Sequence, residues 1–599
     1  MTPAERPENS GEPARRLDVR SVQAASESAA ASIVSHYRLD VFALMLVPYL
    51  LLVWRFWGVV DDAFISFRYA RNFALGHGLR YNLGEHLPVE GYSNFLWVMI
   101  CAVFEFFRLE ITIWPLMLSV LSGVLLLWLV FDTLRRRLKL GLAPACLGML
   151  LVGCFPAFAY WSTSGLATMP FALLVFITFE RLVLRRAGVA GLGAGVAGLL
   201  LALIRVEGIA WVGVLLILAI VSRWLAGQHR WRPLFVFGLI VAGGYALYFA
   251  GRYAYYQLPF PNPVYVKAQT NIELLQRGGC YVMVYVLTFL TPILILPGTF
   301  FALRRKRIVV GLPVAALAWA FPLYALVVTG DYMAMGRFLV PGVAFNALLL
   351  VWMLRDLTGR RGALAAVGAA LVVLGLLPAW NVHLIPERVR GRFHFRHNAK
   401  AFLSEAEQAE KELRNVVRWT NLGRALKYYA RIRALPDPHP SCVSAAIGAV
   451  GYYSDLFIHD RNGLVSRSPL QALRGWDAPS KSPGHDRTVP IEFFLEQRPT
   501  ILYAMLVAEQ EPAAAAVECT KMLTALSLRP ARYRLEEKYA PDFARVPGTN
   551  ADGHPLYLTT WVPLKPGVQP QAAQDAFIAR LAKLHFGQHF PEPPPLPKG

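Results

Sequence analysis

Long apolar segments alternate with short polar loops over roughly the first 380 residues, and the remaining residues lack such segments. A helix needs about 20 mainly apolar residues to cross the hydrocarbon core of a bilayer. The pattern therefore predicts a polytopic α-helical membrane domain with about 11 transmembrane helices. The predicted spans are 41–60, 112–133, 141–160, 170–183, 188–204, 209–222, 233–251, 281–302, 308–328, 338–354 and 362–380.

Basic residues in the connecting loops give an expected topology. The loops rich in Lys and Arg lie at 135–139, 180–186, 223–232, 304–307 and 355–361. Because Lys and Arg gather in cytoplasmic loops, this set of spans places all of these loops in the cytoplasm. The shorter apolar stretch 93–107 covers only about 22 Å as a helix, so we interpret it as a juxtamembrane or re-entrant helix outside.

The same pattern divides the chain into parts. The N-terminal segment is polar and has no apolar core near its start, so a disordered tail is expected rather than a signal peptide. A helical stretch near 397–435 precedes an apolar strand at 499–506, which indicates a small α/β domain. The expected parts are a disordered cytoplasmic tail (1–39), the membrane domain (40–380) with its first periplasmic loop (61–111), a periplasmic α/β domain (381–590) and a Pro-rich tail (591–599).

Composition agrees with a membrane protein. The chain is 55% hydrophobic with a mean hydropathy of +0.41, whereas soluble domains are about 45–50% apolar. In the membrane half the basic residues behind the net charge of +21 lie mainly in short loops, so topology explains them without a nucleic-acid partner. Six cysteines do not make a disulfide scaffold. Cys442 and Cys519, the two in the soluble part, could pair in an oxidising compartment, which leaves that disulfide open.

An aspartate pair, Asp61 and Asp62, directly follows the first predicted span. Carboxylates are costly inside a bilayer, so a pair at its edge favours a functional role. The next segment is expected to be a helix, in which Asp61, Arg68 and Asn72 share one face. A helix N-terminus favours the ionised carboxylate of a general base, and Arg68 and Arg71 could then bind a phosphate. The face shared with Arg68 slightly favours Asp61 as the base; the alternative is that the pair only caps the helix.

Further polar residues interrupt the apolar pattern on the expected outer side. Arg205 and Glu207 lie at a helix boundary, where a structural ion pair is the alternative to a functional one. Lys267 and Arg337 are isolated cations among aromatic residues, and converging cations are what a lipid phosphate requires. Tyr265 also fits an interfacial aromatic belt. The candidate phosphate ligands are Arg68, Arg71, Lys267, Arg337 and Arg205, and the candidate substrate-binding residues are Glu207, Asn262, Tyr265 and Asp331.

The soluble part carries little recognisable chemistry. Its sequence has no Gly-rich nucleotide loop, zinc-type Cys/His spacing or nucleophile elbow. Turn and capping roles are favoured over catalysis for His459, Asp460, His485 and Asp486. No metal-binding residues are predicted and no cofactor is assigned, although a divalent cation stays open.

The segment DDAFISFRYARNFALGHGLRYNLGEHLPVEGYSNFLW (61–97) resembles the first outer loop of bacterial GT-C-fold glycosyltransferases. The nearest group comprises the mycobacterial terminal arabinofuranosyltransferases and their proteobacterial relatives. Two positions depart from it: Ala167, where the family often has Glu, cannot bind an acceptor or metal, and Val206 stands where Pro is frequent. The other similar segments, in the same order, are SGLATMP (164–170), RVEG (205–208), PNPVYVK (261–267), GDYMAMGRFLVP (330–341) and IGAVGYYSDLFIHDRNGL (447–464).

The resemblance implies an inverting glycosyltransferase in the bacterial inner membrane. It would move a sugar, with arabinofuranose as the leading expectation, from a polyprenyl-phosphate donor to an envelope glycan, glycolipid or protein at the periplasmic face. Asp61 or Asp62 would deprotonate the acceptor hydroxyl. A lipid-linked sugar flippase or transporter, or an envelope-assembly protein, is the alternative. The acidic pair lies at the membrane edge and the sequence shows no repeated halves, which favours the transferase.

Overall fold

The structure of this chain is a computed structural model that describes a set of residues between 39 and 585. These are residues 39–185, 190–267, 271–304, 307–358, 361–398, 401–433, 435, 439–467, 483, 486–487, 489, 491–527 and 538–585. Apart from residue 39, the predicted N-terminal and C-terminal tails lie outside this part of the chain.

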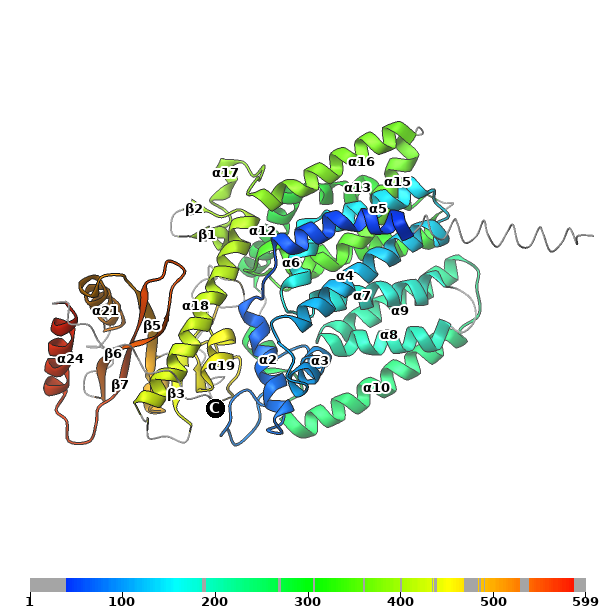
Figure 1. Ribbon diagram of the computed structural model, residues 1–599. Helices are drawn as coiled ribbons and strands as arrows, with labels where there is room; N and C mark the ends of the chain where they lie inside the picture. The colour runs from blue at the N-terminus through cyan, green and yellow to red at the C-terminus, as the bar shows by residue number, and fades with distance from the viewer. Residues whose placement is uncertain are drawn as a thin grey trace, which may run out of the picture.

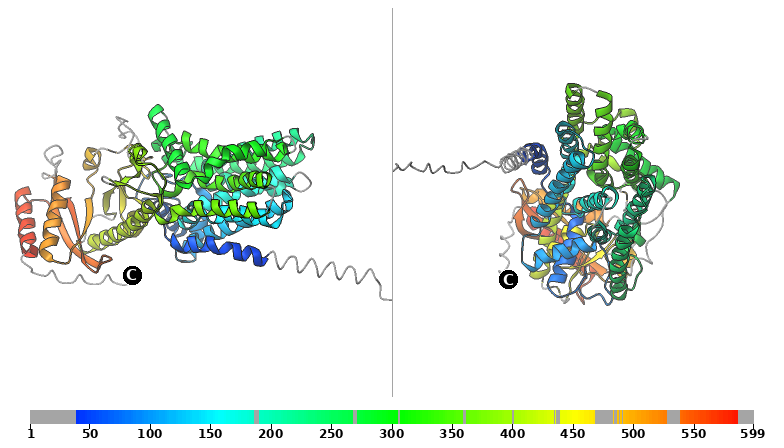
Figure 2. Two further views of the ribbon diagram at one scale, coloured as in Figure 1. Left: turned by 90° about the horizontal axis from the view of Figure 1, so that it is seen from above. Right: turned by 90° about the vertical axis from the view of Figure 1, so that its right-hand side faces the viewer.

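Apolar helices form the membrane half, and they run roughly parallel to one another (Figures 1 and 2). A helix over residues 39–55 comes first. It is followed by α2 (Asp61–Ala74), α3 (Phe95–Phe106), α4 (Trp114–Asp132), α5 (Leu142–Gly153), α6 (Pro156–Thr163), α7 (Thr168–Phe179), α8 (Ala190–Ile204), α9 (Gly208–Leu225), α10 (Arg232–Tyr256), α11 (Asn262–Lys267), α12 (Ile272–Phe289), α13 (Ile295–Ala302), α14 (Ile308–Val327), α15 (Val343–Thr358) and α16 (Arg361–Leu376). Shorter helical turns join several of them, namely η1 (Thr133–Arg137), η2 (Glu180–Leu184), η3 (Thr291–Leu294), η4 (Ala334–Gly342) and η5 (Leu377–Trp380).

Helix length and composition identify the segments that can cross a membrane. Among the described residues, six helices are long and apolar enough, or up to eight if each bent pair counts as one span. One pair, α5 and α6, bends by 57° where Pro156 starts α6. The other, α12 and the η3–α13 segment, bends by 100° at Leu290, whose φ is +56°. The described residues of every predicted span are largely helical, but the first helix ends at residue 55 within the span 41–60. Non-helical residues also interrupt the span 141–160, at 154–155, and the span 281–302, at Leu290. The stretch expected to be juxtamembrane or re-entrant forms α3, whose 12 residues cover only about 18 Å.

The C-terminal part, from about residue 381 on, is an α/β domain, as predicted. The strands β3 and β4 pair in parallel, and α19 connects them. A second sheet is antiparallel, with the order β5-β7-β6. The elements are α17 (Glu387–Arg390), η6 (His394–Arg396), β1 (His397–Asn398), β2 (Ala401–Phe402), α18 (Glu405–Ile432), β3 (Ser441–Ser444), α19 (Gly448–Ser454), β4 (Phe457–Asp460), α20 (Ile491–Glu496), β5 (Leu502–Ala508), α21 (Pro512–Ser527), β6 (Tyr539–Thr549), β7 (Pro555–Pro563) and α24 (Pro570–His585).

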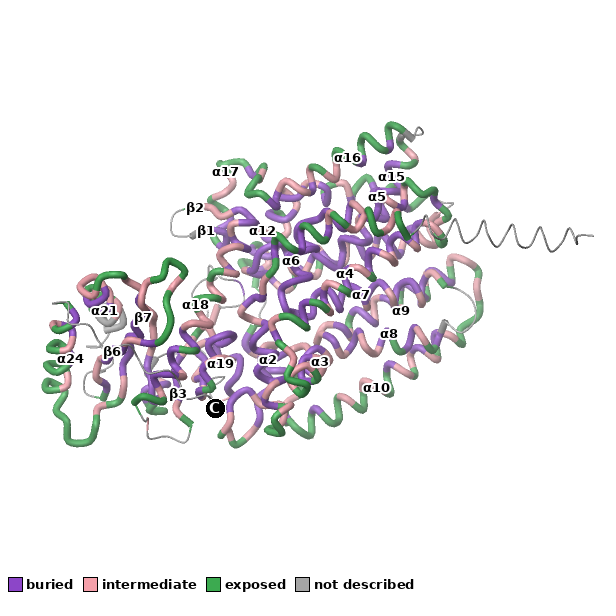
Figure 3. Tube along the Cα trace, viewed as in Figure 1, coloured by how far each residue is buried: buried purple, intermediate pink, exposed green. Residues whose placement is uncertain are grey.

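The soluble domain lies at one end of the helical bundle, and α18 joins the two (Figure 1). Ser404 and Glu407 form a capping box that fixes the first turn of α18. From there α18 packs against η4 of the membrane half, against α19 and against β6. Burial follows this arrangement: α7 is mostly buried, whereas much of α10 is exposed (Figure 3). The exposed residues of α10 include large apolar ones such as Leu247.

Candidate active site

The first turn of α2 is held against the loop between α6 and α7. The Val60 amide donates to the Ser164 carbonyl at 3.0 Å, and the Trp97 indole donates to the Gly165 carbonyl at 3.0 Å. Gly165 has a φ of +77°, and a Cβ there would lie 3.0 Å from the Cβ of Ala63. This close approach requires glycine, and it fixes the place where the aspartate pair begins.

Asp61 is engaged by the soluble domain. Its Oδ1 accepts a hydrogen bond of 2.8 Å from the Ala449 amide at the start of α19. Gly448 packs so closely that a Cβ would lie 2.0 Å from the Asp61 carbonyl oxygen. Burial raises the pKa of Asp61 to about 6, and the charge of Asp62 adds to this rise. Burial therefore outweighs the helix N-terminus in setting this pKa, although the carboxylate is still mostly ionised at neutral pH.

Asp62 differs from its neighbour. The carboxylate is half-buried, and it makes no hydrogen bond or ion pair with any described residue. After Asp331, it is the carboxylate whose charge acts most strongly on the Arg337 guanidinium. It is also the carboxylate that acts most strongly on Tyr332. The charge of Asp62 therefore acts on the segment before α15, whereas the Asp61 carboxylate contacts the soluble domain.

Arg337 lies in η4, within the membrane half. Its Nη2 lies 2.8 Å from Oδ2 of the buried Asp331, and the guanidinium packs near the rings of Trp161 and Phe338, at 5.8 and 4.9 Å. The Arg337 Nε is buried without a hydrogen-bond partner among the described residues. A buried guanidinium with an unused donor is suited to receive an anionic oxygen.

The Arg205 and Glu207 side chains lie near Arg337. Arg205 Nε donates to Glu207 Oε1 at 2.5 Å, and the guanidinium lies 5.5 Å from the ring of Phe171 on α7. The charges of Glu207, Arg205 and Arg337 all act on Tyr324 of α14. The structure thus brings four predicted residues to one place, together with Asp62. They are Arg205, Glu207, Asp331 and Arg337.

Two predicted phosphate ligands, Arg68 and Arg71, form hydrogen bonds with the soluble domain. Arg68 is buried, and its guanidinium donates to the carbonyls of Tyr81, Gly451 and Leu456 at 2.6 to 2.8 Å. Arg71 donates to the Tyr452 carbonyl at 2.8 Å and pairs with Asp455 at 2.6 Å. Both side chains join the first outer loop to the soluble domain. In this structure these contacts of the two guanidinium groups go to the soluble domain and the first outer loop, not to the place of Arg337.

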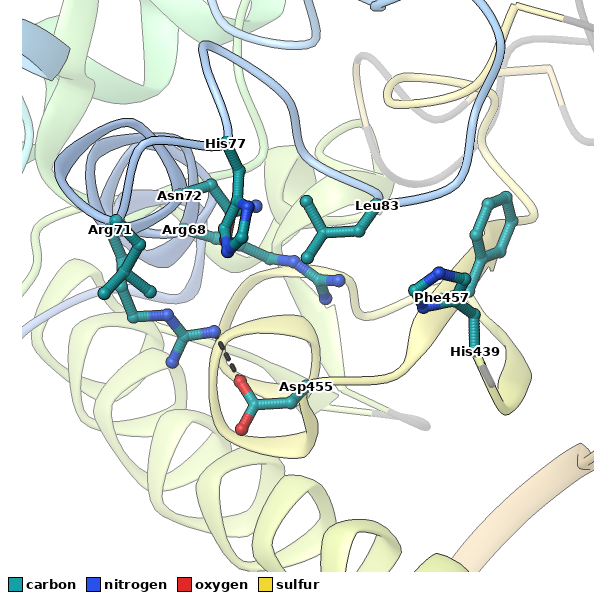
Figure 4. A pocket seen from close by; sticks show the side chains of 9 residues that line it. Arg68, Arg71, Asn72, His77, Leu83, His439, Asp455 and Phe457 are labelled. Atoms are coloured by element: carbon teal, nitrogen blue, oxygen red, sulfur yellow. Dashed lines mark hydrogen bonds and ion pairs between the residues drawn. The ribbon is translucent and has the colours of Figure 1, made fainter. Parts of the chain in front are cut away.

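These arginines line a cavity of about 320 Å³ between the first outer loop and the soluble domain (Figure 4). Arg71 and Asp455 meet across it, and His77, His439 and Phe457 complete its walls. Along α2, Arg71 comes nine residues after Asp62, which is about 13 Å of helix and half a turn out of phase. Neither Asp62 nor Arg337 lines this cavity, which is therefore distinct from the region of Arg337.

The three predicted residues of α11 also serve the domain contact. Asn262 is buried, and its side chain donates to the Gly463, Leu464 and Ser466 carbonyls at 2.7 to 3.2 Å. The Tyr265 carbonyl accepts a hydrogen bond from Arg487 at 3.4 Å. Lys267 is exposed, and its charge acts on Asp460. The structure brings Lys267 toward the soluble domain but does not place it beside Arg337.

Sequence reasoning missed the side chains that hold the Arg337 turn. Arg396 donates to the Tyr332 and Met333 carbonyls at 2.8 and 3.0 Å, and it pairs with Glu405. The Met335 amide donates to Glu405. The turn needs such support because Met335 has a φ of +58°. Nothing in the sequence connects an arginine and a glutamate of the soluble part with a turn about 60 residues earlier.

Glu412 of α18 provides the third support. Its Oε1 accepts from the Ala334 amide at 2.9 Å and from Gln408 at 3.0 Å, and its Oε2 accepts from the Tyr160 hydroxyl at 2.6 Å. Burial raises the pKa of Glu412 to about 7. The soluble domain therefore completes the site instead of lying beside it.

The remaining predicted polar residues of the soluble part have structural roles. Asp460 accepts from the Asn462, Leu464 and Val465 amides, as expected for a turn residue, and burial raises its pKa to about 6. Burial lowers the pKa of His459 to about 4. Asp486 pairs with Arg277 at 2.6 Å, and His485 lies outside the described residues. Cys442 and Cys519 are both free. Within the described part of the chain, no three His, Cys, Asp or Glu side chains gather as a metal site.

The helical bundle with its C-terminal α/β domain defines the GT-C fold class, as the sequence predicted. Solved structures of ArnT from Cupriavidus metallidurans share the fold. The crystal structure bound to undecaprenyl phosphate has a TM-score of 0.54 and 14% sequence identity, covering 88% of this chain and 98% of that chain. The crystal structure in the apo state gives the same values. No protein-family model and no curated protein matches the sequence.

Proposed function

We propose that this protein is an inverting glycosyltransferase that moves a sugar from a polyprenyl-phosphate donor to an acceptor hydroxyl. The observation that carries the proposal is the unpaired Asp62 carboxylate, whose charge acts on Arg337, together with the Arg337 Nε, which has no partner among the described residues. A base and a phosphate-binding cation at the edge of a membrane bundle are the two groups that this reaction requires. The likeness in fold to a protein solved with undecaprenyl phosphate supports a lipid-linked donor.

The reaction follows from these groups. Asp62 accepts the proton of the acceptor hydroxyl as its oxygen attacks the anomeric carbon. The bond between that carbon and the phosphate oxygen breaks on the opposite face, so the configuration inverts and polyprenyl phosphate leaves with its negative charge. Arg337 binds this phosphate, and Arg205 contributes positive charge nearby. General-base catalysis contributes about 10²- to 10⁴-fold, and positioning and charge stabilisation provide the rest.

The contacts favour Asp62 as the base over Asp61. Asp61 accepts an amide hydrogen bond that fixes α2 to α19, so one of its oxygens already has a partner. Asp62 is free to accept a proton from a substrate. We therefore assign proton transfer to Asp62 and a positioning role to Asp61, which reverses the slight preference based on the helical face.

The remaining parts of the proposal rest on the sequence. The positive-inside pattern supports a periplasmic site and a periplasmic soluble domain in the bacterial inner membrane. The resemblance of residues 61–97 to terminal arabinofuranosyltransferases supports arabinofuranose as the first sugar to test, and an envelope glycan, glycolipid or protein as acceptor.

A direct assay tests this proposal. Purified protein is incubated with a panel of polyprenyl-phosphate sugars, and the loss of lipid-linked sugar is followed together with the release of polyprenyl phosphate. We expect consumption of one donor from the panel once an acceptor extract is added. The alternative is tested with the protein in vesicles, where the movement of the lipid-linked sugar between leaflets is measured. Movement of the intact lipid-linked sugar without cleavage would identify a flippase.

A further inference from the structure

A second cavity lies far from Asp62, between α4 and α7. It has a volume of about 180 Å³ and is lined by Leu125, Trp128, Leu129, Leu173, Ile177, Glu180, Arg181 and Arg185. α7 begins beside the candidate active site, and Glu180 follows its last residue, so about 18 Å of helix separates the two sites. Leu125 is 44% exposed on the surface of the bundle, so the apolar wall of the cavity opens toward lipid.

The charges at the mouth of this cavity do not balance. Glu180 is buried, and it accepts from Arg137 at 2.9 Å and from Arg185 at 2.8 Å. Arg181 makes no hydrogen bond or ion pair with any described residue. Among the described residues, Arg137, Arg181 and Arg185 thus bring three positive charges to this region against the single carboxylate of Glu180, an excess of two. Gly193 of α8 leaves room for Arg181, since a Cβ there would lie 2.3 Å from its Nη1.

Both helices that form the mouth end irregularly. α4 continues into the π-helical turn η1, and α7 continues into the π-helical turn η2. The two helices pack against each other, and the Arg137–Glu180 contact joins the two turns. Single π-helical turns are rare and occur frequently at functional sites. Basic residues at this end of the bundle are expected from topology alone, but topology explains neither the apolar cavity beneath them nor the unpaired Arg181.

We infer that this cavity binds one anionic phospholipid. Part of an acyl chain lies on the apolar wall, and the phosphate lies against Arg181 and Arg185. The two unbalanced positive charges favour a headgroup without a compensating amine. This inference does not depend on the proposed glycosyl transfer, because it concerns the opposite end of the bundle.

Native mass spectrometry of the delipidated protein tests the inference. Phosphatidylglycerol and phosphatidylcholine with identical chains are titrated separately, and the affinity for the first bound lipid is compared. We expect tighter binding of phosphatidylglycerol. Arg181→Gln should weaken the binding of phosphatidylglycerol about fivefold, because one arginine near an anionic lipid surface contributes about 1 kcal/mol. Arg136 provides the matched control, since it lies in η1, is 64% exposed, pairs with Asp132 and does not line the cavity.

Arg136→Gln should change the affinity less than twofold. Ile177→Phe should weaken the binding of both lipids, because the larger ring fills the apolar wall. Equal affinity for the two lipids would overturn the inference. So would an Arg181→Gln protein that binds phosphatidylglycerol as the unaltered protein does, or an Arg136→Gln protein that loses as much affinity as Arg181→Gln.

Discussion

Glu412 offers the sharpest test of the role of the soluble domain. Replacing it with Leu removes the acceptor for the Ala334 amide and for the Tyr160 hydroxyl, and both donors are buried. Each unpaired buried donor costs about 1–3 kcal/mol, so the free energy of unfolding should fall by about 3 kcal/mol. Glu412→Gln keeps an acceptor for Ala334 and should stay within about 1 kcal/mol.

The same substitution should impair catalysis through Arg337. Displacing a positioned group by about 1 Å costs on the order of 100-fold, so Glu412→Leu should lower kcat/KM by about that factor. A double-mutant cycle with Arg337→Lys separates positioning from general destabilisation. If both residues act through the same turn, the effects of the two substitutions on kcat/KM do not add. We expect a coupling energy above about 1 kcal/mol.

Glu410 is the matched control on the same helix. It is about one-third exposed and pairs with Arg55 at 2.8 Å. A surface ion pair contributes about 0–1 kcal/mol, so Glu410→Leu should change neither stability nor kcat/KM by much. The reasoning fails if Glu410→Leu and Glu412→Leu behave alike, or if the Glu412 and Arg337 effects on kcat/KM are additive.

Three further predictions concern topology, the phosphate site and pH. Reporter fusions after Gly330 and after Gly463 should both read as external, and a cytoplasmic signal at Gly463 would reverse the orientation. Arg337→Lys keeps a charge beside Asp331, so it should raise the KM for the donor at least tenfold with little change in thermal midpoint; an unchanged KM places the phosphate elsewhere. Asp61 has a pKa of about 6 in the folded protein and 3.8 in the unfolded chain. The protonated side chain therefore contributes stability that is fully present below pH 3.8 and is lost as the pH rises through 6. As the pH rises from about 4 to 7, Asp61→Asn should therefore gain stability relative to the unaltered protein, by at most about 3 kcal/mol, and the difference should then level off; a thermal midpoint difference independent of pH would contradict this.

The sequence predicted the fold class and much of the candidate site, because both depend on local patterns. Hydropathy and loop charge placed the polar motifs at one end of the bundle, and Arg205, Glu207, Asp331 and Arg337 do gather there. The helical period also placed Asp61 and Arg68 correctly on one face. That face is covered by the segment 447–457, about 380 residues later in the chain, so both side chains serve the domain contact.

Long-range contacts of this kind leave no trace in a single sequence. The Arg68 guanidinium looks like a phosphate ligand until the carbonyls of Gly451 and Leu456 are found to occupy it. Glu412 looks like any acidic residue on a charged helix, and only its packing against Tyr160 and Ala334 gives it a role. The pKa of Asp61 could not be predicted either, because burial by α19 sets it.

The most direct test of the central claim compares Asp62→Asn with Asp61→Asn. Both proteins are purified, their thermal midpoints are checked, and single-turnover transfer is measured with the polyprenyl-phosphate sugar that the panel identifies. The account predicts that Asp62→Asn loses about 10²- to 10⁴-fold in rate, while Asp61→Asn stays within about tenfold of the unaltered protein. A greater loss in Asp61→Asn, or near-normal transfer by Asp62→Asn, would contradict it.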